Sequence, residues 1–219
     1  MFSSGNSPVV RKLFWLSAFC FVLEFFRLVT TQTLSYIFLP WNLILAWVPL
    51  GFALLPFETY KPVKRSGVIV AWLLFFPNAP YIITDLIHLR PQGTFPLWYD
   101  AILVYSFAFT GLLVGMMSAL IVYRKLQTFI SVWVSKGLLL FAMLLSGYGI
   151  YIGRFLRWNS WDILFDPIQI LAATGQRLIN PMDYPRTYGV TLVVGVMLSL
   201  VFLLFDEIAK QHRTEKPND

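Results

Sequence analysis

The sequence has few charged residues and almost no cysteine. Asp, Glu, Lys and Arg make up 13% of its 219 residues, which is about half the share found in soluble domains. So few charges cannot cover the surface of a soluble globule of this size, which excludes a soluble enzyme, a disordered chain and a coiled coil. The single cysteine, Cys20, excludes an internal disulfide and a zinc cluster of thiolates. The chain also has no nucleotide-binding motif, serine nucleophile elbow or zinc signature.

Hydrophobic residues dominate the chain instead. They make up 58% of it, and the mean hydropathy is +0.68. A helix that crosses the hydrocarbon core of a membrane needs about 20 mainly apolar residues. Six such runs occur, at 13–31, 36–55, 67–84, 97–123, 137–156 and 188–205. The sequence therefore predicts an all-α fold, a polytopic membrane protein built as a bundle of about six transmembrane helices.

Prolines interrupt the third of these runs. Pro77 and Pro80 lie inside it, and proline in a span is tolerated when other groups satisfy the freed backbone carbonyls. We therefore expect the third helix to kink, or to unwind after Phe76.

The distribution of Lys and Arg predicts the orientation, because cytoplasmic connections carry an excess of them. One set of alternate connections has Arg11, Lys12, Lys61, Lys64, Arg65, Arg124, Lys125, Lys136, Lys210, Arg213 and Lys216, and the other has Arg90, Arg154, Arg157, Arg177 and Arg186. Eleven against five predicts that both termini are cytoplasmic. We expect a cytoplasmic N-terminal segment at 1–12, a transmembrane domain at 13–206 and a cytoplasmic polar tail at 207–219. The net charge of +6 then reflects topology, and nucleic acid is not an expected partner.

The longest connection, 158–187, contains the pattern of a short amphipathic helix. Asp166, Pro167 and Gln169 have the spacing of an N-cap, a first-turn proline and a capping-box partner. Apolar residues then recur on one helical face, at Ile168, Leu171, Ala172, Gly175, Leu178 and Ile179. This extracytoplasmic loop is expected to lie on the outer membrane surface, or alternatively to pack as a lid on the bundle. Residues 126–136 could form a similar interfacial helix on the cytoplasmic side.

Two pairs of glycines have the spacing of close helix contacts. They are Gly111 with Gly115 and Gly149 with Gly153, and small residues four apart let helix backbones approach closely. The contact could join two copies as a homodimer, or it could be packing inside the monomer.

Polar residues near membrane depth gather in three short, aromatic-rich stretches. The members are Asn78, Asp85 and His88 in 76–88, Tyr99 and Asp100 in 98–100, and Arg154, Arg157, Asn159 and Asp162 in 153–162. The predicted orientation puts all three at the extracytoplasmic end of the bundle, where they could converge on one site. Glu24 and Arg27 form a separate pair in the first span, where mutual neutralisation is the default because an unpaired charge in hydrocarbon is costly.

The three stretches allow more than one chemistry. Asp85, His88 and Asp100, joined by Asp162, could hold a divalent cation such as Mg²⁺, Mn²⁺ or Ca²⁺. Alternatively, His88 could act as a general base oriented by Asp85 or Asp100. Remaining polar side chains would then bind the substrate, with two arginines on an anionic phosphate or carboxylate; they are Asn78, Tyr99, Arg154, Arg157, Asn159 and Asp162. The third interpretation is a neutralised network that only positions helix ends.

The same stretches resemble one protein family. Phe-Pro-Asn-Ala-Pro-Tyr at 76–81, Thr-Asp-Leu-Ile-His-Leu at 84–89, Trp-Tyr-Asp at 98–100 and Gly-Arg-Phe-Leu-Arg-Trp-Asn-Ser-Trp-Asp at 153–162 are similar to the motifs of domain of unknown function 1361. The resemblance covers most of the chain and implies an integral protein of the bacterial cytoplasmic membrane. It implies no activity, substrate or cofactor.

Three functions remain open at this stage. The first is a membrane site, with the lipid bilayer as its surroundings, that binds or processes an anionic lipid, a phosphate or an envelope precursor. The second is a small secondary carrier in which the broken third helix moves. The third is a non-catalytic accessory or assembly subunit whose glycine faces bind partner helices.

Overall fold

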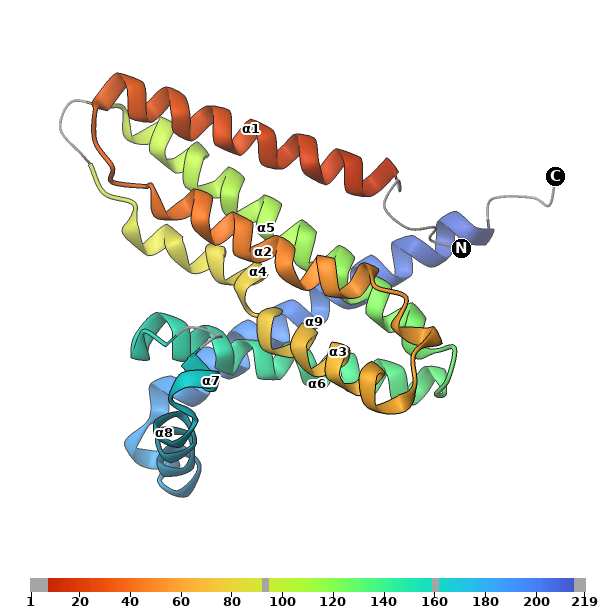
Figure 1. Cartoon of the computed structure of the whole chain (residues 1–219). Helices are drawn as coiled ribbons and strands as arrows, with labels where there is room; N and C mark the ends of the chain where they lie inside the picture. Colours follow the sequence, from red (N-terminus) through yellow and green to blue (C-terminus); the bar gives the residue numbers. More distant parts are fainter. Residues whose placement is uncertain (1–7, 92–94, 159–161, 215–219) are drawn as a thin grey trace. The chain divides into compact units, whose positions relative to one another are not determined.

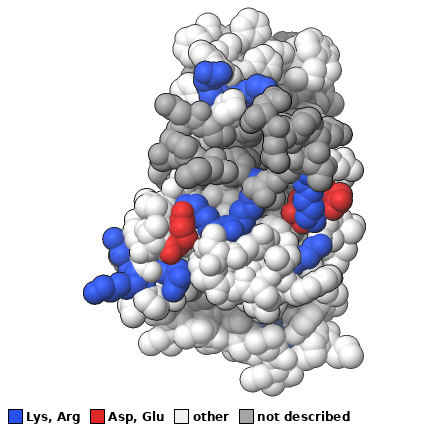
Figure 2. All heavy atoms as spheres, turned by 90° about the vertical axis from the view of Figure 1, so that its right-hand side faces the viewer, with Lys and Arg blue, Asp and Glu red and all other residues white. Residues whose placement is uncertain are grey.

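The computed structural model describes residues 8–91, 95–158 and 162–214, and these residues form helices and turns with no strand. Six helical stretches are long and apolar enough to cross a membrane: Pro8–Thr31, Phe38–Thr59, Pro62–His88, Leu97–Leu126, Val132–Leu156 and Pro185–Gln211. The predicted all-α architecture with six spans is therefore confirmed, and the chain is a multi-pass membrane protein. On the face in Figure 2, uncharged residues form most of the described surface.

The chain divides into two compact units, Met1–Val122 and Tyr123–Asp219, which are described separately. Unit 1 contains α1 (Pro8–Thr31), α2 (Phe38–Leu54), α3 (Pro62–Phe75), α4 (Asn78–Tyr81) and most of α5 (Leu97–Leu126). In this unit α1, α2 and α5 run alongside one another (Figure 1). The hydrophobic core of this unit consists of Cys20, Tyr36, Leu39, Leu43, Ala46, Ala79, Ile82, Leu103, Val104, Phe107 and Ala108.

The third span is interrupted where its prolines lie, as predicted. The helix α3 ends at Phe75, the short α4 begins at Asn78, and a 3₁₀ segment, η2 (Ile82–His88), follows. Proline has no N–H to continue the ladder of hydrogen bonds. The side-chain amide of Asn78 donates to the carbonyl oxygen of Phe75 at 2.9 Å, which satisfies a backbone acceptor at the break.

The pair Gly111 and Gly115 faces the interrupted span within unit 1. A Cβ atom at Gly111 would lie 2.7 Å from the carbonyl oxygen of Ala79, and one at Gly115 would lie 2.9 Å from the Ala79 side chain. Only glycine leaves room for this backbone approach. The face is therefore filled by packing inside the monomer, which corrects the alternative that it joins two copies.

Unit 2 is built around α6 (Val132–Tyr151) and α9 (Pro185–Thr214), which pack against each other (Figure 1). The two backbones approach closely at Gly147, where a Cβ atom would contact the carbonyl oxygen of Thr191. On the other side of the crossing, a Cβ at Gly195 would lie 2.8 Å from the Cα of Leu144. The crossing therefore includes Gly147, which the sequence motif did not mark. A contact through Gly149 and Gly153, either in a dimer or inside the monomer, stays a prediction.

Between these helices lie a π-helical turn, η3 (Ile152–Leu156), the short α7 (Asp162–Phe165), the amphipathic α8 (Pro167–Ile179) and η4 (Pro181–Asp183). The predicted amphipathic helix is confirmed, but its capping box is wrong, because the side chain of Asp166 makes no capping hydrogen bond. The predicted helix at 126–136 is also wrong. The helix α5 ends at Leu126, and Ser131 caps α6 by accepting from the Val134 N–H at 3.3 Å.

The apolar side of α8 points away from unit 2. Ile168, Leu171 and Leu178 are between 68% and 78% exposed, whereas Thr174 accepts a hydrogen bond from the Tyr148 hydroxyl of α6 at 2.9 Å. Unit 2 therefore leaves these apolar side chains uncovered, and whether α8 lies against lipid or packs as a lid on the bundle stays a prediction.

A spin label at position 171 should report this contact with lipid. In vesicles, a label on Leu171→Cys should be more accessible to dissolved oxygen than to a water-soluble relaxing agent. Gln176→Cys is the matched control, because Gln176 is an exposed polar residue of the same helix. Equal accessibility profiles at the two positions would contradict an interfacial α8.

Candidate functional site

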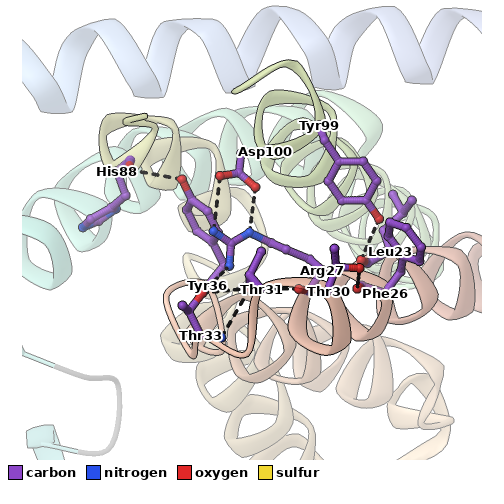
Figure 3. A network of polar contacts seen from close by, with 10 residues as sticks. All are labelled: Leu23, Phe26, Arg27, Thr30, Thr31, Thr33, Tyr36, His88, Tyr99 and Asp100. Atoms are coloured by element: carbon purple, nitrogen blue, oxygen red, sulfur yellow. Dashed lines mark hydrogen bonds and ion pairs between the residues drawn. The ribbon is translucent and has the colours of Figure 1, made fainter. Parts of the chain in front are cut away.

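One end of unit 1 contains a buried polar network. It forms where α1 ends, α2 begins, η2 ends and α5 begins, and Arg27 lies at its centre between Asp100 and Tyr36 (Figure 3). The network connects side chains that are far apart in the sequence.

Arg27 and Asp100 form its ion pair. The Arg27 Nε lies 2.6 Å from Oδ1 of Asp100, and Nη2 donates to Oδ2 at 3.3 Å. Both side chains are buried, with exposures of 0% and 1%. This two-point geometry uses the planar fork of the guanidinium. The predicted pairing of Arg27 with Glu24 is therefore wrong, because Asp100 from another helix meets the guanidinium with both oxygens.

The rest of the Arg27 guanidinium is held by groups that sequence analysis did not single out. Nη1 donates to the Thr33 hydroxyl at 3.3 Å. The guanidinium carbon lies 4.4 Å from the ring centroid of Tyr36 and 5.7 Å from that of Phe95, at cation–π range. No local spacing could have marked Thr33 and Tyr36, since they reach Arg27 only after the chain turns between α1 and α2.

Tyr36 connects this ion pair to His88. Its hydroxyl donates to the backbone carbonyl of His88 at 3.4 Å (Figure 3). Burial raises the pKa of the Tyr36 phenol, and the negative charge of Asp100 raises it further. Tyr36 therefore keeps its proton at neutral pH and remains a donor.

Asp85 and His88 share one side of η2, as their spacing predicted. The Asp85 side chain is 1% exposed, and its Oδ1 lies 3.9 Å from Nδ1 of His88. The other oxygen accepts from the Asn42 amide at 2.9 Å. The Nδ1 atom is buried without a hydrogen-bond partner, while the His88 side chain as a whole is 40% exposed. A fixed carboxylate thus lies behind an imidazole that reaches the surface.

The remaining predicted residues of unit 1 contact backbone or other side chains. The Tyr99 hydroxyl donates to the Leu23 carbonyl at 2.8 Å and joins α5 to α1. Asn78 occupies the break of the third span, and Asp100 is committed to Arg27. Asp85 is therefore the carboxylate that accompanies His88.

The described residues contain no cluster of side chains that could hold the divalent cation considered above. Within residues 8–91, 95–158 and 162–214, no three His, Cys, Asp or Glu side chains are grouped so that they could hold a metal ion.

The third predicted stretch belongs to unit 2. Arg154 lies within the π-helical turn η3, and Arg157 ends that turn with a left-handed backbone, φ 60°. Asp162 is the first residue of α7, and Asn159 lies outside the described residues. Convergence of this stretch with Asp85 and His88 stays a prediction.

Comparison with known proteins gives one match. A family model described as "Protein of unknown function (DUF1361)" matches residues 41–201. The matched region is more than half of the chain and includes Asn42, Asp85, His88, Asp100 and Arg154. No curated protein and no solved structure matches the chain.

Proposed function

The chain belongs to the DUF1361 family of proteins of unknown function, and we propose that Asp85 and His88 form a proton-transfer site that binds and processes an anionic group. The group is a lipid headgroup, a phosphate or a cell-envelope precursor. The observation that carries the proposal is the half-exposed imidazole of His88 next to the buried carboxylate of Asp85.

This geometry suits a general base. Histidine changes its protonation state near neutral pH, and a neighbouring carboxylate stabilises the imidazolium that forms when it accepts a proton. Asp85 is held by Asn42, so it can orient His88 without turning away. The separation of 3.9 Å is longer than a hydrogen bond, and such contacts tighten when a substrate binds.

Charge supports an anionic substrate and an outward-facing site. Arg154 and Arg157 of unit 2 stay predicted anion-binding residues, because planar guanidinium groups suit phosphate and carboxylate. The excess of basic residues in the alternate connections supports an orientation in which the end of unit 1 that contains His88 faces the outer side of the membrane. The membrane in this proposal is the bacterial cytoplasmic membrane.

A small secondary carrier is the second candidate, and one observation favours it. The third span is interrupted between α3 and α4, and interrupted helices line substrate sites in transporters. Gradient-driven uptake into proteoliposomes would distinguish the carrier from the proton-transfer site. The accessory-subunit alternative has no such support, because Gly111 and Gly115 are packed inside unit 1.

Substitution of the proton-transfer pair tests the first proposal. In a strain that lacks the gene, Asp85→Asn and His88→Gln should reduce complementation by 10²-fold or more, which is about the usual contribution of a general acid or base. Both variants should remain folded in detergent, since each nearly preserves the volume of the side chain.

The second histidine of the chain provides the matched control. His212→Gln makes the same chemical change at the C-terminal end of α9 and should complement as well as the natural chain. Full complementation by both Asp85→Asn and His88→Gln would disprove the proposal.

A further inference from the structure

Glu24 has the most unusual environment of the acidic residues in unit 1. It lies in α1, its side chain is 3% exposed, and neither Oε1 nor Oε2 has a hydrogen-bond partner. A buried carboxylate is normally paired or hydrogen-bonded, because an isolated charge loses its hydration. The question is therefore whether the Glu24 carboxyl group is charged or neutral in this site.

Among the described residues, the charges around Glu24 include no cation besides Arg27. Arg27 from its own helix and Asp100 from α5 lie within electrostatic range, together with the hydroxyls of Tyr36 and Tyr99. The guanidinium is already engaged by Asp100 and Thr33. Two ionised carboxylates with one guanidinium would leave a net negative charge in a buried site within a membrane span, which is costly.

We propose that Glu24 is a proton-binding site within the first span, and that loss of its proton draws Arg27 from Asp100 toward Glu24. Bound to a proton, the carboxyl group is neutral and coexists with the Arg27–Asp100 pair. Without the proton it becomes a second anion for the same guanidinium. Residues three apart on a helix lie on the same side, so Arg27 can reach Glu24 by a change of rotamer.

The same movement would reach the end of η2. Arg27 lies against the ring of Tyr36, whose hydroxyl donates to the His88 carbonyl. A shift of the guanidinium therefore changes the surroundings of a contact to the η2 backbone. The inference itself is independent of the role proposed for His88, because it rests only on Glu24, Arg27 and Asp100.

Infrared difference spectroscopy tests the proton site directly. Between acidic and alkaline samples, the protein should lose a carbonyl band of a protonated carboxylic acid, and Glu24→Gln should lack that band. Asp206→Asn is the control, because Asp206 is also buried but has the Lys210 ammonium at 2.8 Å. Persistence of the band in folded Glu24→Gln protein would overturn the proposal.

Isotope labelling shows without a substitution whether the band belongs to a glutamate. In the natural chain labelled with ¹³C at glutamate carboxyls, the band should move to lower frequency. A band that does not move, or no band at all, would overturn the assignment to Glu24 even if Glu24→Gln failed to fold.

The Arg27 side chain reports the second part of the proposal. Its ¹⁵Nε–¹H resonance should shift with pH in the natural chain and stay constant in Glu24→Gln. A resonance that shifts equally in both proteins would show that Arg27 does not follow Glu24.

Discussion

Asp100→Ala should destabilise the protein by about 3–5 kcal/mol, which is the usual cost of leaving one member of a buried ion pair alone. Arg27 would remain buried without the carboxylate that balances its charge, while Thr33 and two aromatic rings still lie beside its guanidinium. The free energy of unfolding, measured in detergent with a mild denaturant, provides the test.

Two further variants separate the effect of the Asp100 charge on stability from the effect of its side-chain volume. Asp100→Asn should retain part of the contact and lose less stability than Asp100→Ala. The double variant Arg27→Met with Asp100→Leu should recover most of the loss, because apolar residues of similar volume often replace a buried pair without penalty. If Asp100→Ala unfolds with the free energy of the natural chain, the pair contributes nothing to stability.

Gly147→Leu should separate α6 from α9 and cost about 3 kcal/mol or more, since overpacking against a backbone leaves no flexible side chain to move. Even Gly147→Ala should destabilise, because the added Cβ would contact the Thr191 carbonyl. Thermal unfolding of the purified protein, followed by circular dichroism, measures the effect.

The matched control lies on the same helix. A Cβ atom at Gly137 has no neighbour within 4 Å, so Gly137→Leu should change stability by no more than about 0.5 kcal/mol. Equal melting temperatures for Gly137→Leu and Gly147→Leu would contradict the close crossing of α6 and α9.

Features that depend on neighbouring residues could be predicted from the sequence. The six spans follow from apolar length, and the break after α3 follows from Pro77. The helix α8 follows from its apolar spacing, although its capping box fails because the Asp166 side chain makes no capping hydrogen bond. The spacing of Asp85 and His88 likewise predicted that they share one side of a helix.

Features that depend on how helices face one another could not be predicted. The glycine motifs did not mark Gly147, which meets the backbone of α9, because the rotation of α6 against α9 selects the residue at the crossing. Asn42 carried no signal as a partner of Asp85, since α2 reaches η2 only in the folded unit.

The sequence by itself determined that this protein is a helical, multi-pass membrane protein with polar residues concentrated in a few stretches. Apolar length and proline position are local properties, so they need no knowledge of the fold. Only the tertiary structure decided which charges pair. Asp100 lies 73 residues from Arg27 and takes its guanidinium, while Glu24, three residues away, has no hydrogen-bond partner. In a low-dielectric interior the geometry of approach, and not proximity in the chain, determines which carboxylate binds the cation.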